Sequence, residues 1–368
     1  MSVRWKENWQ ETQAHFTAWW QQRGLVVSSW SGWGSPLVGT PVEAVEEAGP
    51  ARDDIERRIN TAWVARNNHW GLALRRYPLD CLPITDTNQL GPGALATFLG
   101  ADPVFEPSTV WYKPCIDDAD HAPPLRFDPD SRWWRLTDEQ LRAMTQMSSG
   151  RYLVGCPDLV ENIDTLAALR DSQTLLLDMI ERPAWVEERV WEINRAFFEA
   201  YQHIYDIIKE PDGGVAFSAF SLWAPGTMAK VQCDASAMFS PAMFKQFVVP
   251  ALTQQCEWLE YSMFHLDGHQ CICHLDHLLA IDALDAIEWT PDPRVPSGGN
   301  ACWYELYRRI LSAGKSVQAI GVRHDEIVPL LDAVGPAGMY IMTDMSQPAS
   351  AERVARLVEP YYQQVRNA

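Results

Sequence analysis

Short apolar runs alternate with longer amphipathic runs through most of the chain after about residue 80. The apolar runs predict strands at 81–84, 152–155, 214–220, 229–232, 262–265, 286–289, 316–320 and 339–342. The longer runs predict helices at 162–180, 183–209, 241–261, 273–281, 303–313, 325–334 and 349–365. Strands that alternate with helices form parallel βα units with right-handed crossovers. Seven or more units favour a closed barrel over an open sheet. The expected fold class is therefore α/β, a single (β/α)8 barrel.

The first 78 residues have a different character. They are rich in tryptophan and helical in their spacing, with an interruption at 31–36 and helix-like spacing again at 53–63. We expect residues 1–78 to be a helical extension packed on the barrel, and residues 79–368 to form the barrel itself. The total length is compatible with one elaborated barrel.

Composition narrows the classes of function. A net charge of −18 argues against nucleic acid and anionic membrane surfaces as partners, because both are bound through a surplus of Lys and Arg. No window is apolar for long enough to span a membrane, and the N-terminus lacks the apolar segment of a signal peptide. The eight scattered cysteines fit reduced thiols of a cytoplasmic protein. Among 17 tryptophans, we expect some, such as Trp111 and Trp289, to line a ligand pocket.

Candidate chemistry is expected at the carboxyl ends of the strands, where (β/α)8 barrels carry their active sites. The polar residues in such places are Asp86, Asn88, Cys156, Asp158, Asp234, His265, Asp267, Glu288, His324 and Asp344. The densest cluster is 265–277, which holds four of the nine histidines. His265 and Asp267 are two residues apart, so both can project to one side of a strand. Together they can bind a divalent metal or act as an acid/base pair.

Each candidate also has a purely structural interpretation. His274 and His277 have the spacing of helix-packing residues, and Cys271 and Cys273 are better read as inert thiols than as a metal pair, because no second pair is present. Aspartates such as Asp86 and Asp234 can be helix caps. No glycine pattern typical of dinucleotide or P-loop binding follows any predicted strand.

Several segments together resemble the uroporphyrinogen-decarboxylase-like superfamily. They are 84–105, 110–111, 155–157, the end of the long helix at 181–183, 240–250, 264–268, 284–289 and 338–348. The resemblance is closer to the corrinoid-dependent methyltransferases than to the true decarboxylase, whose Arg-rich N-terminal stretch is not found here. It implies a (β/α)8 barrel, which in this superfamily often forms a homodimer.

The related methyltransferases hold zinc with a His-x-Cys-Gly segment and a later Cys. Here the first segment is His265-Leu266-Asp267-Gly268, and the later position falls near Asp344. The resemblance therefore implies a metal site of His265, Asp267 and Asp344. Its oxygen and nitrogen donors are harder, in the acid–base sense, than thiolates and suit zinc, manganese or iron. Alternatively no metal binds, and His265 and Asp267 contact the substrate or transfer a proton.

Three functions remain open at this point. The first is methyl transfer from a small methylated substrate to a separate corrinoid protein, since the chain has no corrinoid-binding motif of its own. The second is a decarboxylase or other lyase acting on a smaller substrate than the tetrapyrrole, with His265, Asp267 and Asp86 as acid/base groups. The third is a barrel that binds a small ligand without turnover. In each case we expect Asn88, Trp111, Asp234 and Trp289 to contact the small molecule.

Overall fold

Six parallel strands form the main sheet of the computed structural model, which describes residues 3–29, 42–107 and 109–367. The strands are β1 (Leu25–Ser29), β7 (Met228–Gln232), β8 (Tyr261–Asp267), β9 (Ala286–Thr290), β10 (Ser316–Val322) and β11 (Met339–Thr343). Their order is β1-β11-β10-β9-β8-β7, and every neighbouring pair is parallel. The carboxyl ends of all six strands therefore lie at one edge of the sheet. The predicted interruption at 31–36 lies outside the described residues.

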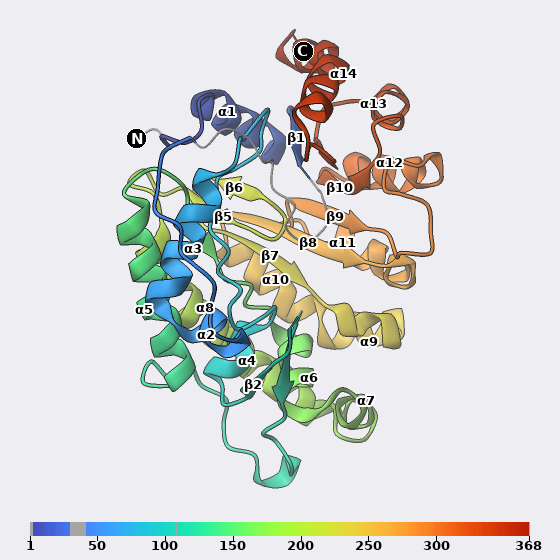
Figure 1. Cartoon of the computed structure of the whole chain (residues 1–368). Coiled ribbons are helices and arrows are strands. Elements are labelled where there is room, and N and C mark those ends of the chain that lie inside the picture. The colour runs from blue at the N-terminus through green and yellow to red at the C-terminus, as the bar shows by residue number, and fades with distance from the viewer. Residues whose placement is uncertain (1–2, 30–41, 108, 368) are drawn as a thin grey trace.

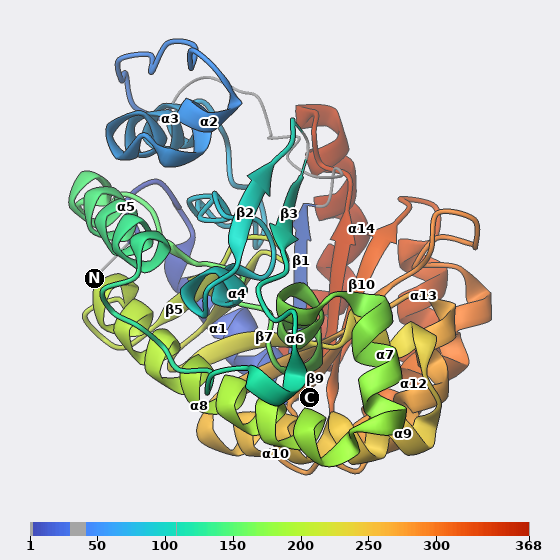
Figure 2. The same cartoon turned by 90° about the horizontal axis from the view of Figure 1, so that it is seen from below.

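Helices that follow these strands form an outer layer (Figures 1 and 2). They are α9 (Pro241–Phe247), α10 (Val249–Trp258), α11 (Leu275–Leu279), α12 (Tyr304–Ser312), α13 (Ile327–Val334) and α14 (Pro348–Asn367). The strands are buried on both faces and are correspondingly rich in Val, Ile, Leu and Met, as parallel strands under helices are. The predicted α/β architecture with a parallel sheet is confirmed.

In the described ranges, a second, three-stranded sheet is separate from the main sheet in its hydrogen bonding. It contains β4 (Gly155–Cys156), β5 (Val215–Phe217) and β6 (Leu222–Ala224), and an isolated parallel bridge joins Ile84 to Leu153. The predicted strand at 214–220 is in fact a strand followed by a hairpin, because Ser221 adopts a φ of 51° and turns the chain back. The hydrogen-bonded sheets are separate within the described residues, so closure into an eight-stranded barrel stays a prediction.

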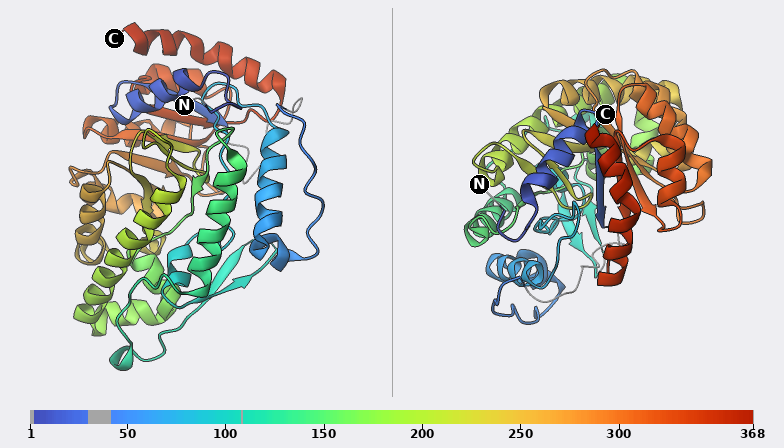
Figure 3. Two further views of the ribbon diagram at one scale, coloured as in Figure 1. Left: turned by 90° about the vertical axis from the view of Figure 1, so that its left-hand side faces the viewer. Right: turned by 90° about the horizontal axis from the view of Figure 1, so that it is seen from above.

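The N-terminal segment contributes to the main sheet itself. Its elements are α1 (Trp9–Trp20), β1, α2 (Asp54–Ile59) and α3 (Thr61–Ala73), so the segment is not entirely helical. β1 pairs with β11, and Trp19 Nε1 donates a hydrogen bond to the carbonyl of Gly338 at 3.1 Å. α1 also contacts α14, since the rings of His15 and Tyr362 stack at 4.5 Å (Figure 3). The boundary at residue 78 stays a prediction.

The remaining elements lie in the connections between strands. They are α4 (Ala94–Phe98), β2 (Asp102–Phe105), β3 (Val110–Lys113), η1 (Ala119–His121), α5 (Arg132–Ser148), α6 (Asn162–Arg170), α7 (Ser172–Glu181), α8 (Pro183–Ile208), η2 (Asp234–Met238), η3 (His269–His274) and η4 (Ala301–Trp303). β2 and β3 form an antiparallel hairpin. α3 packs beside α5, which places α2 and α3 outside the arc of helices that surrounds the strands (Figures 2 and 3).

Two predicted helices are each divided into two. The helix expected at 162–180 breaks at Asp171, whose φ of 85° is incompatible with a helix and whose carboxylate caps α7 through the N–H groups of Gln173 and Thr174. The helix expected at 241–261 breaks at Val248, just before Pro250. Proline has no N–H to donate and is favoured in the first turn of a helix, so it starts α10 instead of continuing α9.

The described residues contain no helix that combines the length and the apolar character needed to cross a bilayer.

The carboxylate of Glu210, which lies outside the sheets, makes the stability of the fold depend on pH. Glu210 Oε2 accepts a hydrogen bond from Trp223 Nε1 at 2.7 Å, and burial raises the pKa of Glu210 to about 7 from its ordinary value of 4.5. The folded chain thus binds a proton that the unfolded chain has released, and the free energy of unfolding falls as pH rises between these values. We expect Glu210→Gln to be about 3 kcal/mol more stable than wild type at pH 8 and close to it at or below pH 4.5 in urea unfolding. Glu139→Gln, on the exposed face of α5, is the control; the same pH profile for wild type and Glu210→Gln would contradict the assignment.

Candidate metal and substrate site

A row of polar side chains crosses the main sheet near its carboxyl edge. Gln232 on β7 is in register with His265 on β8, and His265 is in register with Glu288 on β9. Residues opposite one another in neighbouring strands project to the same face. The parallel register therefore brings an amide, an imidazole and a carboxylate side by side, in strands that are otherwise mostly apolar.

His265 is fixed by its neighbours on this face. Its Nδ1 is hydrogen-bonded to the buried carboxylate of Glu288, and Thr290 Oγ1 donates to the other oxygen of Glu288 at 2.6 Å. The ring of Phe220 lies 4.8 Å from the imidazole. Burial alone would lower the pKa of His265, but the carboxylate of Glu288 outweighs burial and raises it. With Nδ1 held in this way, Nε2 faces the open edge of the sheet.

Two aspartates lie close to the imidazole of His265. Asp267 Oδ2 lies 3.9 Å from Nε2, and ligand atoms of Asp234, His265 and Asp267 all lie within 4.8 Å of one another. In the described part of the chain, this is the group with the composition and spacing to hold a metal ion. The side chain of Asp267 is 46% exposed, whereas that of His265 is 11% exposed. The group is therefore open on the side of Asp267 and closed behind His265.

The chemistry of these donors fits a divalent metal. Two carboxylates and one imidazole provide three ligands and leave further positions for substrate or water. A ligating histidine usually donates its second ring N–H to a carboxylate, which sets the tautomer and the ring orientation, and Glu288 is placed to do this. Asp234, His265 and Asp267 would be the ligands.

Asp234 is oriented by hydrogen bonds with Gln232 and Asp164. Gln232 Nε2 donates to Asp234 Oδ2 at 2.8 Å, and the backbone N–H of Asp234 donates to Asp164 Oδ2 at 2.7 Å. Burial, together with the charge of Asp164, raises the pKa of Asp234 to about 6. A nearby cation would relieve this cost, so the carboxylate has an electrostatic reason to bind one.

A buried ion pair involves Lys230, which lies on β7, the strand that leads to Asp234. Lys230 Nζ donates to Asp158 Oδ1 at 2.8 Å, and the two side chains are 1% and 8% exposed. Burial would lower the pKa of Lys230, but the carboxylates of Asp158 and Glu161 together raise it. Burial raises the pKa of Glu161 to about 8, and Asp158, which is in direct contact with Lys230, is its counter-charge.

The third predicted metal ligand lies elsewhere. Asp344 follows β11, three strands away from His265 in the sheet. Its carboxylate accepts the N–H of Ser346 at 3.0 Å, and its carbonyl is hydrogen-bonded to His324 Nε2. The structure groups Asp234 with His265 and Asp267 instead, because β7 is the direct neighbour of β8. Asp234, predicted as a substrate contact, thus becomes a metal-ligand candidate.

The predicted residues Asp86 and Asn88 line a large cavity beside the cluster. Its volume is about 1350 Å³, and Asp158 lines it as well. Asn88 Oδ1 accepts the N–H of Asp158 at 2.9 Å, and Asp86 Oδ1 accepts the N–H of Asn88 at 3.0 Å. Asp86 and Asn88 therefore lie where a small molecule can reach them, but Asp86 is not part of the group formed by His265 and Asp267.

The two tryptophans predicted as substrate contacts are placed differently. Trp289 follows Glu288 in β9 and so points to the opposite face, where it is fully buried 4.8 Å from the ring of Trp303. Trp111 on β3 is 65% exposed, and its neighbour Val110 lines the cavity in its place. The alternation of side chains along a strand explains both outcomes.

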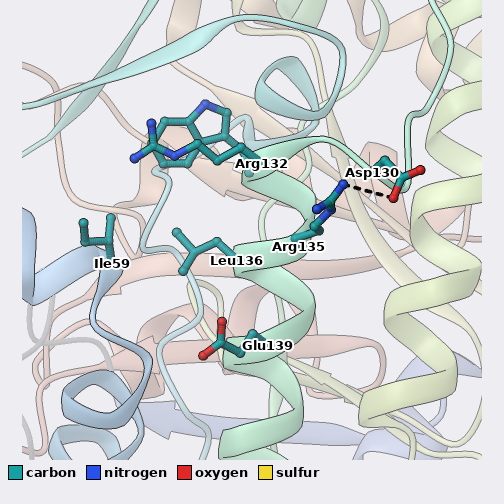
Figure 4. A pocket seen from close by; sticks show the side chains of 7 residues that line it. Ile59, Asp130, Arg132, Arg135, Leu136 and Glu139 are labelled. Carbon is teal, nitrogen blue, oxygen red and sulfur yellow. Dashed lines mark hydrogen bonds and ion pairs between the residues drawn. The ribbon is translucent and has the colours of Figure 1, made fainter.

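A second hollow of about 420 Å³ lies on the surface of α5 (Figure 4). Arg135 pairs with Asp130 at 3.1 Å there, and both side chains are exposed. The hollow contains none of the residues predicted from sequence.

Several residues of the site were missed by sequence reasoning. Lys230 has a recognisable signal, since it is a charged residue inside a predicted apolar strand. Asp164 and Glu161 carry no such signal, because they belong to the start of a helix and approach β7 only in the folded chain. His274 behaves as its structural interpretation predicts: it is buried and its ring stacks on Phe244 at 4.4 Å.

Comparison with known proteins supports the fold. Neither the known family models nor the curated protein sequences contain a match to this chain. Among solved structures, the chain is similar to a methyltransferase from Methanosarcina mazei, with a TM-score of 0.59 over 95% of this chain and 99% of that one. The two sequences are 11% identical, so the similarity concerns the fold.

Proposed function

We propose that this chain is a methyltransferase that moves a methyl group from a small methylated substrate to a corrinoid carried by a separate protein. The observation that carries the proposal is the group of Asp234, His265 and Asp267 at the strand ends of a fold similar to that of a methyltransferase. The sequence resemblance to the corrinoid-dependent methyltransferases adds to it.

The residues of the site have distinct roles in this reaction. The methyl group leaves its heteroatom, the bonding pair stays on that heteroatom, and the cobalt(I) of the corrinoid supplies the pair for the new bond. A divalent metal bound by the three donors would act as a Lewis acid and stabilise the negative charge on the heteroatom. Glu288 holds Nδ1 of His265 so that Nε2 remains a free acceptor, and Phe220 closes one side of the imidazole to water.

The proposal is tested by mixing the purified protein with cob(I)alamin and a panel of methylated amines, thiols and alcohols. We expect one donor class to give the absorbance change of methylcobalamin formation, and expect that change to disappear after exhaustive chelation and return with added metal. Failure of every donor to alkylate cobalamin would contradict methyl transfer. Methylcobalamin formation that survives chelation would contradict the role of a metal in the transfer.

A further inference from the structure

Two adjacent pairs of arginines meet at the large cavity. Arg57 and Arg58 end α2, whereas Arg75 and Arg76 follow α3, and all four line the same space of about 1350 Å³. α2 and α3 are consecutive helices that contact each other, and the two pairs flank opposite ends of α3. That both pairs line one cavity is not evident in the sequence, where they are separated by a helix.

The charge of the cavity contrasts with that of the chain. The acidic residues of its lining are Glu47, Asp86 and Asp158, and the whole chain carries a net charge of −18. Asp158 is already neutralised by Lys230, at 2.8 Å. Arg57 is likewise paired with Asp54, at 3.4 Å, which leaves Arg58, Arg75 and Arg76 against Glu47 and Asp86. The lining therefore has a small excess of positive charge although acids outnumber bases in the chain as a whole. Such an excess inside a cavity attracts anions.

Three of the four arginines have charge to offer a ligand. Arg58 donates to the carbonyl oxygens of Gln89 and Thr109, which fix its guanidinium without neutralising it. Within the residues that the structure describes, Arg75 makes no ion pair, and its buried Nε has no hydrogen-bond partner. Arg76 reaches only the exposed carboxylate of Glu7, at 3.9 Å. A positioned guanidinium binds a carboxylate or a phosphate through paired N–H groups.

The rest of the wall is apolar and aromatic. Trp63, Trp70 and Tyr77 line it together with Leu72 and Met342. The volume exceeds the ~300–1,000 Å³ of ordinary small-ligand pockets, so a molecule with a substantial body fits. A ligand for such a space combines an apolar or aromatic body with one or more anionic groups.

We infer that this cavity binds an organic anion, whose carboxylate or phosphate group contacts Arg75 and Arg76 and whose body packs on Trp63 and Trp70. Asp234, His265 and Asp267 do not line the cavity, but Ser218 and Ser221 do, and Phe220 between these two serines lies 4.8 Å from the ring of His265, so a single side chain separates the cavity from the candidate metal site. The link to catalysis rests on the proposed function: if the chain is a methyltransferase, its methylated substrate belongs to this class of organic anions.

The test uses two fluorescent probes that differ in charge. Anilinonaphthalene sulfonate carries an anionic group on an aromatic body, and phenylnaphthylamine has nearly the same body without the charge. In the Arg75→Gln/Arg76→Gln double variant we expect the Kd for the sulfonate to rise by about tenfold or more, because two charge-assisted contacts are lost. The Kd for the neutral probe is expected to stay within about twofold of wild type. Arg142→Gln/Arg356→Gln, two exposed arginines on α5 and α14, is the control with the same change in net charge.

Competition identifies the anion. Displacement of the sulfonate by benzoate indicates a carboxylate ligand, and displacement by inorganic phosphate indicates a phosphate ligand; either supports the inference. Equal affinity of the double variant and the control variant for the sulfonate would overturn it, as would an equal loss for both probes. His265→Ala is expected to bind the sulfonate like wild type, so a failed methyl-transfer assay leaves this result standing.

Discussion

The His265→Ala variant is expected to lose divalent-metal binding, with the Kd rising more than ~100-fold, and to lose any metal-dependent turnover with it. His265 is the one imidazole donor of the group, and its ligand atom lies within 4.8 Å of those of Asp234 and Asp267. Glu288→Gln should weaken metal binding by ~10–100-fold, since it removes the carboxylate that orients the imidazole but leaves all three ligands. Calorimetric titration of chelator-treated protein with zinc and manganese measures both effects.

Matched variants separate the observed cluster from the one predicted by sequence. Asp234→Asn is expected to weaken metal binding at least ~10-fold, whereas Asp344→Asn should stay within ~2-fold of wild type. His121→Ala, an exposed histidine paired with Asp118, is the control for loss of a surface imidazole. A stronger effect of Asp344→Asn than of Asp234→Asn would show that the ligand set is wrong.

The Lys230→Met variant is expected to reduce the free energy of unfolding by about 3–5 kcal/mol, because it leaves the carboxylate of Asp158 buried without its counter-charge. Methionine fills a similar volume, so the loss reports mainly on the charge and not on a cavity. Urea unfolding at neutral pH measures the effect. The slope of the free energy of unfolding against urea concentration should be unchanged, which shows that the unfolded state is the same.

A second variant makes this result specific. Lys230→Met/Asp158→Asn removes both charges and should recover a large part of the stability lost in the single variant. Lys245→Met, on an exposed position of α9, is expected to change stability by less than about 0.5 kcal/mol. If the double variant is as unstable as Lys230→Met, the ion pair is not what stabilises this part of the fold.

The order of strands and helices after residue 80 was predictable, because a parallel strand under helices is a short apolar run and the helices between strands are amphipathic. The breaks at Asp171 and Val248 were not predicted, although Asp171 is a good cap and Pro250 a helix starter. β1 was also missed. The run Leu25-Val26-Val27 is short, and its partner β11 lies at the other end of the chain, so nothing local indicates the pairing.

The candidate site was predictable in part. His265 and Asp267 share a strand end, and their spacing of two residues is enough to place them together. Which third residue joins them depends on which strands are neighbours and in what register, and sequence spacing does not contain this information. The same limit applies to the arginines of the cavity, which meet only because α2 and α3 pack together.

The pairing of β1 with β11 also sets the order in which the chain can fold. The ribosome delivers β1 long before β11, so β1 has no partner on that side until the whole segment between them has emerged. Contacts between distant parts of a chain are slow to form, because a long loop must close first. During that interval an apolar strand edge is exposed to other chains. A nascent chain that stalls before β11 would therefore be a preferred substrate for chaperones.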